Sequence, residues 1–135
     1  MSEELIGEWL KAASKDLKNI GYIIEDESLT SIVAFHSQQA VEKSFKALLV
    51  YQGGRIPKIH KLQTLIDTCN IDLEMDDILI QTLDGVYIES RYPGNIGLLP
   101  EGSPKKEKAK ELYEFALNIF DKVCGIVGVD KNEIE

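Results

Sequence analysis

The sequence predicts a single all-α domain, folded as an antiparallel up-and-down bundle of about five helices. Its 135 residues fit one domain. Apolar side chains recur at steps of three and four, as they do on one face of a helix, and no segment shows the strict alternation that is typical of a strand. We expect the bundle to span residues 1–128 and the tail, residues 129–135, to be frayed.

The first two predicted helices contain most of the apolar face. The first covers about residues 2–25, and the second, about residues 29–52, ends at Gly53-Gly54, a usual helix stop. The second is apolar around much of its circumference, which predicts cover by neighbouring helices and by a second subunit. The apolar face of the first helix comprises Leu5, Trp9, Ala13, Leu17, Ile20 and Ile24.

Three further helices are predicted after Gly54. A short one covers about residues 61–69, and the next begins near Asp76-Asp77 and runs to about Ser90. Residues 91–100 contain two prolines and two glycines, which predicts a loop. Ser103-Pro104 reads as the N-cap and first residue of the last helix, which ends around residues 125–128.

Composition and charge narrow the function classes. The net charge of -8 argues against broad adhesion to nucleic acid, because phosphate binding needs clustered Lys and Arg. The start, Met1-Ser2-Glu3-Glu4, is acidic where a secretory signal is basic. We expect a cytoplasmic protein that does not enter a membrane. A local basic cleft remains possible, and its candidates are Lys43, Lys46, Arg55, Lys58, Lys61 and Arg91.

Neither a metal nor a cofactor is expected. Cys69 and Cys124 lie in different predicted helices, without CxxC spacing or a nearby histidine, so we interpret both as reduced core thiols. The acidic pairs at residues 3–4 and 76–77 are typical of helix starts. No glycine-rich phosphate loop is present in the sequence.

A polar stripe on the second helix is the first candidate site. In a helix, His36, Gln39 and Lys43 share one face beside the apolar one. These side chains either hydrogen-bond within the bundle or across a dimer interface, or they form the wall of a pocket. In the pocket interpretation Lys43 attracts phosphate and His36 changes its charge near neutral pH.

Two further candidates flank later helices. His60 precedes the third predicted helix, where it either caps free backbone amides or lies at the mouth of a cleft. Arg91-Tyr92-Pro93 opens the glycine-containing loop, where a guanidinium group can bind a carboxylate or phosphate with two hydrogen bonds. An internal salt bridge is an equal alternative for Arg91.

These motifs together resemble the HEPN family, named after members in higher eukaryotes and prokaryotes. The resemblance covers most of the chain and rests on FHSQQAVEKSFKALL at residues 35–49, on His60-Lys61-Leu62, and on Tyr87 followed by Arg91-Tyr92-Pro93. It implies an up-and-down bundle, usually dimeric and often encoded beside a minimal nucleotidyltransferase in toxin–antitoxin-like pairs. Some members are metal-independent ribonucleases, and others are regarded as nucleotide binders.

The resemblance also implies a catalytic motif from which this sequence departs. The ribonucleases use Arg-x(4-6)-His, with the RNA 2′-hydroxyl as nucleophile. Arg91 matches the motif arginine, but Ile96, Gly97 and Leu98 occupy the three positions where the histidine would stand.

A literal match to the motif spacing runs from Arg55 to His60, but it lies in the preceding loop and contains a proline. We interpret it as fortuitous. General acid–base catalysis then needs His36 or His60 to lie near Arg91 in the fold.

Three functional hypotheses follow. The first is a homodimeric HEPN protein, non-catalytic or weakly catalytic, that binds a nucleotide or a nucleotidyltransferase partner. Its ligand-binding candidates are His36, Gln39, Lys43, His60, Arg91 and Tyr92. The second is a metal-independent ribonuclease that uses Arg91 with a relocated histidine, His36 or His60. The third is a purely structural module in which the polar stripe sets the register of a dimer.

Overall fold

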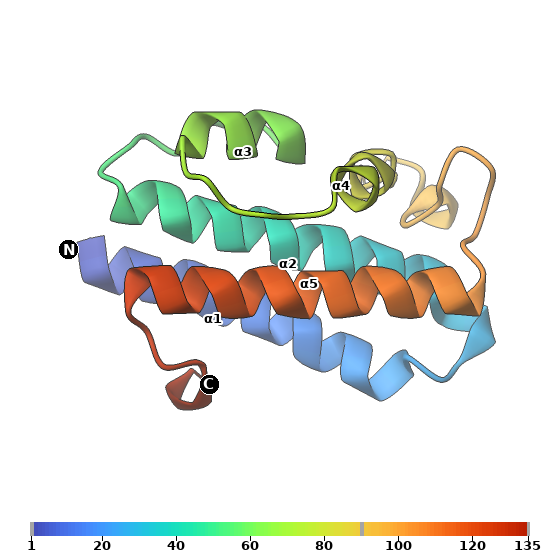
Figure 1. Cartoon of the computed structure of the whole chain (residues 1–135). Coiled ribbons are helices and arrows are strands. Elements are labelled where there is room, and N and C mark those ends of the chain that lie inside the picture. The colour runs from blue at the N-terminus through green and yellow to red at the C-terminus, as the bar shows by residue number, and fades with distance from the viewer. Residues whose placement is uncertain (1, 90, 135) are drawn as a thin grey trace.

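Three helices of 22 residues form the body of the molecule: α1 (Ser2–Ile23), α2 (Thr30–Tyr51) and α5 (Lys106–Val127). The computed structural model describes residues 2–89 and 91–134, and in it the three helices lie side by side (Figure 1). α1 and α2 are antiparallel and are joined by the 3-10 turn Glu27–Leu29. α5 runs in the same direction as α2, because the segments between them return the chain to the end of the bundle where α2 begins.

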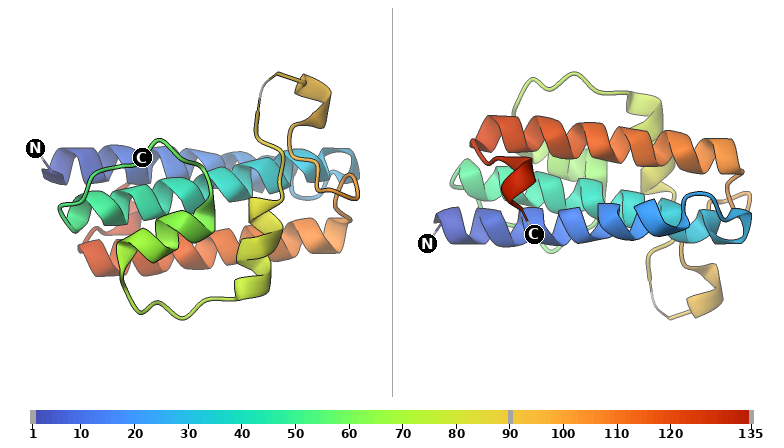
Figure 2. Two further views of the ribbon diagram at one scale, coloured as in Figure 1. Left: turned by 90° about the horizontal axis from the view of Figure 1, so that it is seen from above. Right: turned by 90° about the horizontal axis from the view of Figure 1, so that it is seen from below.

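Two short helices, α3 (Leu62–Cys69) and α4 (Asp77–Asp84), pack over α2. The loop of residues 52–61 runs back along α2 before α3 begins, so its last residues lie beside the middle of α2 (Figure 2). α4 is seen end-on in Figure 1 and therefore crosses the long helices. The predicted all-helical bundle of five helices is confirmed for the described residues.

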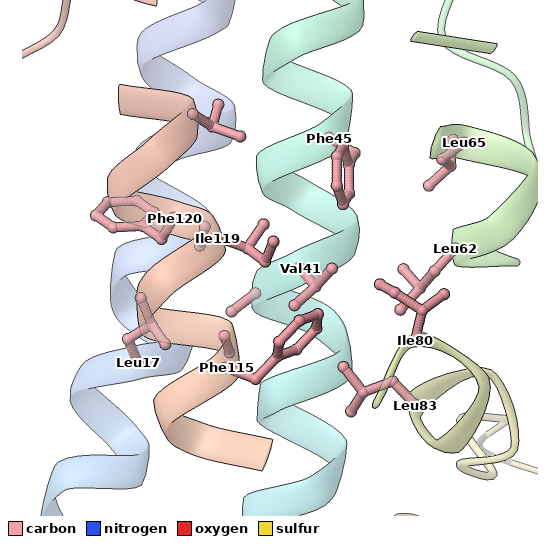
Figure 3. Packing of buried hydrophobic residues seen from close by; sticks show 14 of the residues in the cluster. Leu17, Val41, Phe45, Leu62, Leu65, Ile80, Leu83, Phe115, Ile119 and Phe120 are labelled. Carbon is pink, nitrogen blue, oxygen red and sulfur yellow. The ribbon is translucent and has the colours of Figure 1, made fainter. Parts of the chain in front are cut away.

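The core forms where α2 meets the other four helices (Figure 3). Phe45, which is 1% exposed, lies on the α2 face that looks toward α3, α4 and α5. α2 is buried along most of its length, as its apolar circumference predicts. The surrounding helices contribute Leu17 from α1, Leu62 and Leu65 from α3, Ile80 and Leu83 from α4, and Phe115, Ile119 and Phe120 from α5.

The prediction for the end of α4 was wrong, since the helix stops at Asp84 rather than near Ser90. Gly85 follows the last helical residue, and glycine has a low helix propensity. The amide of Tyr87 then donates to the carbonyl of Leu98 at 2.9 Å, and the amide of Gly97 donates to the carbonyl of Tyr87 at 2.7 Å. The chain therefore leaves the helix to close a loop; Ser90 lies outside the described residues.

The predicted start of the last helix also needs correction. α5 begins at Lys106 rather than at Pro104, which is buried ahead of the helix, and Lys105 occupies the N-cap position without a side-chain cap. The tail contains the 3-10 turn Lys131–Glu133, capped by Asp130, and Ile134 packs against the core. This stretch of the tail therefore contains a turn and one apolar contact with the bundle.

None of the helices in the described part of the chain is long and apolar enough to cross a membrane. The same residues contain no strand, only one isolated bridge between Leu99 and Gly102.

Candidate functional site

A buried carboxylate on α2 organises the first group of polar residues, which we call the Glu42 cluster: Gln38, Glu42, Lys46 and His60. The Glu42 side chain is 4% exposed. It accepts hydrogen bonds from Gln38 Nε2 at 3.0 Å and Lys46 Nζ at 2.9 Å. His60 Nδ1 lies 3.1 and 3.0 Å from its two oxygens. Gln38 Nε2 also donates to the carbonyl of His60 at 3.2 Å, which fixes the end of the loop against α2.

The charge of the buried Lys46 ammonium is balanced by partners inside the protein. Without them, burial of the charge would cost much free energy. Its side chain is 8% exposed. Besides Glu42, its Nζ atom faces the Trp9 ring, 5.2 Å from the ring centre, in a cation–π contact. Lys46 therefore belongs to the internal packing between α1 and α2 and does not contribute to a surface basic cleft.

A second buried carboxylate organises the Asp16 cluster: Asp16, His36 and Lys43. Asp16 comes from α1, and its side chain is 8% exposed. Its Oδ1 lies 2.7 Å from His36 Nδ1, and its Oδ2 accepts from Lys43 Nζ at 2.7 Å. A phosphate at Lys43 would have to compete with this carboxylate. The remaining residue of the predicted stripe, Gln39, donates to Gln38 Oε1 at 2.7 Å and so contacts the Glu42 cluster.

The two histidines are held in the same way but differ in exposure. In each, Nδ1 faces a buried carboxylate, which favours the tautomer with hydrogen on Nδ1 and leaves Nε2 as the free nitrogen. The His36 side chain is 19% exposed, whereas that of His60 is 64% exposed. Only His60 therefore presents a fixed ring broadly to solvent.

A pocket of about 330 Å³ lies beside His60. Its walls are Gln38, His60, Lys61, Leu83, Asp84, Val86 and Ile88. The Asp84 carboxylate accepts from the amides of Leu62 at 2.6 Å and Gln63 at 3.2 Å, so it caps α3 from α4. Gln38 is also satisfied internally. The hydrogen-bonding groups left for a ligand are therefore His60 Nε2 and the exposed Lys61 ammonium.

Arg91 and Tyr92 follow the pocket residue Ile88 in the chain. They belong to the loop between α4 and α5, which projects from the bundle (Figure 2). Both side chains are exposed, and among the described residues Arg91 makes neither an ion pair nor a side-chain hydrogen bond. Three residues of extended chain span at most about 11 Å, so Arg91 begins within that distance of Ile88. At the base of the loop, an alanine Cβ at Gly97 would lie 1.8 Å from the carbonyl oxygen of Ser31 on α2.

The predicted site residues thus form three groups rather than one. His36 and Lys43 meet at Asp16, Gln39 and His60 meet at the Glu42 cluster, and Arg91 with Tyr92 lies on the exposed loop.

Sequence reasoning missed the two organising carboxylates and Asp84. Asp16 stands between the buried Ala13 and Leu17, and Glu42 follows the buried Val41. The presence of a charged residue within an apolar helical face could have identified both Asp16 and Glu42 from the sequence.

Comparison with known proteins assigns the family. A model of the HEPN domain matches residues 6–127, so the chain belongs to the HEPN family. The structure is similar to the crystal structure of ST0689, an archaeal HEPN homologue, with a TM-score of 0.66 and 28% sequence identity. That match covers 90% of this chain and 97% of the other. No match was found among curated proteins.

Proposed function

We propose that this HEPN domain binds a nucleotide through its phosphate in the pocket beside His60. The observation that supports the proposal most directly is the arrangement of two polar groups there. His60 is fixed through Nδ1 by the buried Glu42, and its free Nε2 and the neighbouring Lys61 ammonium have no partner among the described residues. An anion takes hydrogen bonds from the Lys61 ammonium, and it takes one from His60 Nε2 when the imidazole is protonated, since Nε2 of the neutral Nδ1–H tautomer only accepts.

The apolar part of the pocket suits the rest of the ligand. Leu83, Val86 and Ile88 line the wall next to His60 and Lys61. An apolar wall with a few convergent polar groups is the usual composition of a small-molecule site. In this proposal the base and ribose contact that wall, and Arg91, on the loop that starts there, adds a second cation for the phosphates.

A titration with ATP, followed by isothermal calorimetry, tests the proposal. Lys61→Ala and His60→Gln should each weaken binding by about tenfold, because each removes one polar group that faces the phosphate. Lys58→Ala is the matched control, since Lys58 is an exposed cation of the same loop that does not line the pocket. Equal losses in Lys58→Ala and Lys61→Ala, or no binding at millimolar ATP, would contradict the proposed site.

The Glu42–His60 hydrogen bond also supports a second candidate, a metal-independent ribonuclease. A carboxylate that holds the Nδ1 edge of a histidine and leaves Nε2 free is the arrangement of a general base. In this candidate His60 supplies the histidine that is absent after Arg91. RNA incubated with the protein in EDTA should then be cleaved, and the cleavage should disappear in His60→Gln and in Arg91→Ala. Intact RNA in every sample would contradict the ribonuclease candidate and would not affect the proposal of nucleotide binding.

The assembly is proposed from the family alone. We propose that the domain works as a homodimer beside a minimal nucleotidyltransferase, in a toxin–antitoxin-like pair. Light scattering of the purified protein tests the dimer, and co-purification with a co-expressed nucleotidyltransferase tests the pair. If variants of the two carboxylate clusters alter only the oligomeric state, the polar residues of α2 are structural.

A further inference from the structure

We infer that a groove between α4 and α5 is a docking surface for a basic peptide segment of a partner protein. The groove is lined by the end of the linker between α3 and α4, by α4 and by α5, and this linker passes alongside α5 (Figure 2). Its volume is about 580 Å³. The inference is independent of the nucleotide proposal, because the two sites share no residue.

The groove has an apolar floor and an acidic rim. Met75, Leu79 and Phe115 form the floor, and each is buried or half-buried. The carboxylates on the rim come from both sides: Glu74 and Asp76 from the linker and the start of α4, and Glu111 and Glu114 from α5. The other residues lining it are Asn118 and Lys122.

The lining of the groove is negative on balance, because Glu74, Asp76, Glu111 and Glu114 outnumber its one cation, Lys122. The Glu111 carboxylate is paired with Lys108 at 2.6 Å, and both partners are exposed, so the pair is weak. Asp76 accepts from the amides of Ile78 and Leu79. Asp77 and Glu107 add further exposed carboxylates on the same two helices. A chain with net charge -8 therefore concentrates several of its acidic groups around one groove.

The spacing of these carboxylates favours an extended cationic partner over a metal ion. Among the described residues, no group of three or more Asp, Glu, His or Cys side chains is arranged to hold a metal. Carboxylates spread along a groove match cations that are spread along a peptide, and such charge complementarity increases association rate and selectivity.

The protein itself places one lysine in this groove. Lys122 lines it, and its ammonium donates to the backbone carbonyl of Glu74 at 2.8 Å. The groove therefore already holds one lysine ammonium at its rim, against a backbone carbonyl of the linker. A partner segment that alternates basic and apolar side chains would extend this contact.

A short fluorescent peptide that alternates lysine with leucine is the probe, and its binding to the full chain is followed by anisotropy. The double variant Glu111→Gln with Glu114→Gln should weaken binding by about tenfold, because two rim charges are lost. The matched control is Glu89→Gln with Glu101→Gln, which removes the same charge from exposed positions outside the groove. All four positions are exposed, and circular dichroism checks that both double variants stay folded.

A second peptide, with serine in place of leucine, separates docking from general attraction between charges. The serine peptide should bind more weakly than the leucine peptide, because the apolar floor then contributes nothing. The inference is overturned if the two peptides bind equally, if the groove and control variants lose the same affinity, or if the leucine peptide does not bind at low salt.

Discussion

Gly97 is the residue that fixes the loop carrying Arg91 against the bundle. Its φ of +83° lies in the left-handed region, and its missing side chain allows close contact with Ser31 of α2. The two backbone hydrogen bonds between the Tyr87 and Gly97–Leu98 segments close the loop at the same point. The direction in which Arg91 leaves the bundle is therefore determined at the base of the loop.

Replacement of Gly97 tests this anchor. Gly97→Ala should lower the free energy of unfolding by at least about 2 kcal/mol, because the new Cβ clashes with backbone and adopts a disfavoured φ. Urea unfolding measures the change. Gly94→Ala in the same loop is the control, since its Cβ would meet nothing within 4 Å. It should stay within about 0.5 kcal/mol of the wild type, and similar losses in both variants would contradict the anchor.

The two cysteines are buried thiols whose protonation depends on folding. Burial raises the pKa of Cys69 to about 11, and burial together with the nearby Asp121 raises that of Cys124 to about 11. The folded protein therefore holds these protons more tightly than the unfolded chain, whose thiols titrate near 9.0. Their contribution to stability is complete below that value and is lost as the pH rises through about 11.

Alkylation with iodoacetamide near neutral pH measures this protection. Labelling of the folded protein should be at least roughly a hundredfold slower than in urea, because two pKa units reduce the thiolate fraction by that factor. Rapid labelling of either thiol in the folded protein would show that its burial is incomplete.

At the scale of elements, the apolar spacing predicts the three long helices well, and the glycines mark the end of α2. Local spacing does not determine where α4 ends, because Asp84 and Tyr87 are engaged by α3 and by residues 97–98, which are distant in the sequence. The polar stripe on α2 was likewise predictable, whereas its partner Asp16 depends on how α1 packs against α2.

The cap that Asp84 gives to α3 joins two short helices, each too short to be stable alone. Asp84→Ala should lower the free energy of unfolding by about 1–2 kcal/mol, because two backbone amides of α3 lose their acceptor. Asp67→Ala is the control, since Asp67 is exposed and accepts only from the Gln63 side chain. Thermal or urea unfolding compares the two, and equal effects would contradict a specific cap.

At the scale of the whole molecule, α2 is the helix whose side chains hold the candidate site in place. It is packed by α1, α3, α4 and α5, and its two carboxylate clusters lie between these helices. The family and the helical bundle could be predicted from the sequence, because motif residues and apolar spacing are local patterns. The grouping of the site residues could not be predicted from the sequence, since each group depends on contacts between segments that are distant in the chain.

The most direct test of the account is an NMR titration of the isotope-labelled protein with ATP, which locates the bound nucleotide. We predict that the largest shifts occur at the Gln38 side-chain amide and at the backbone amides of His60, Lys61 and Ile88, which surround the proposed pocket. A second pocket, of about 640 Å³, is lined by Leu5 near the start of α1, by Val50 near the end of α2 and by Ile56, and it should be unaffected. Shifts concentrated there, or no shifts at millimolar ATP, would contradict the claim that the pocket beside His60 binds a nucleotide.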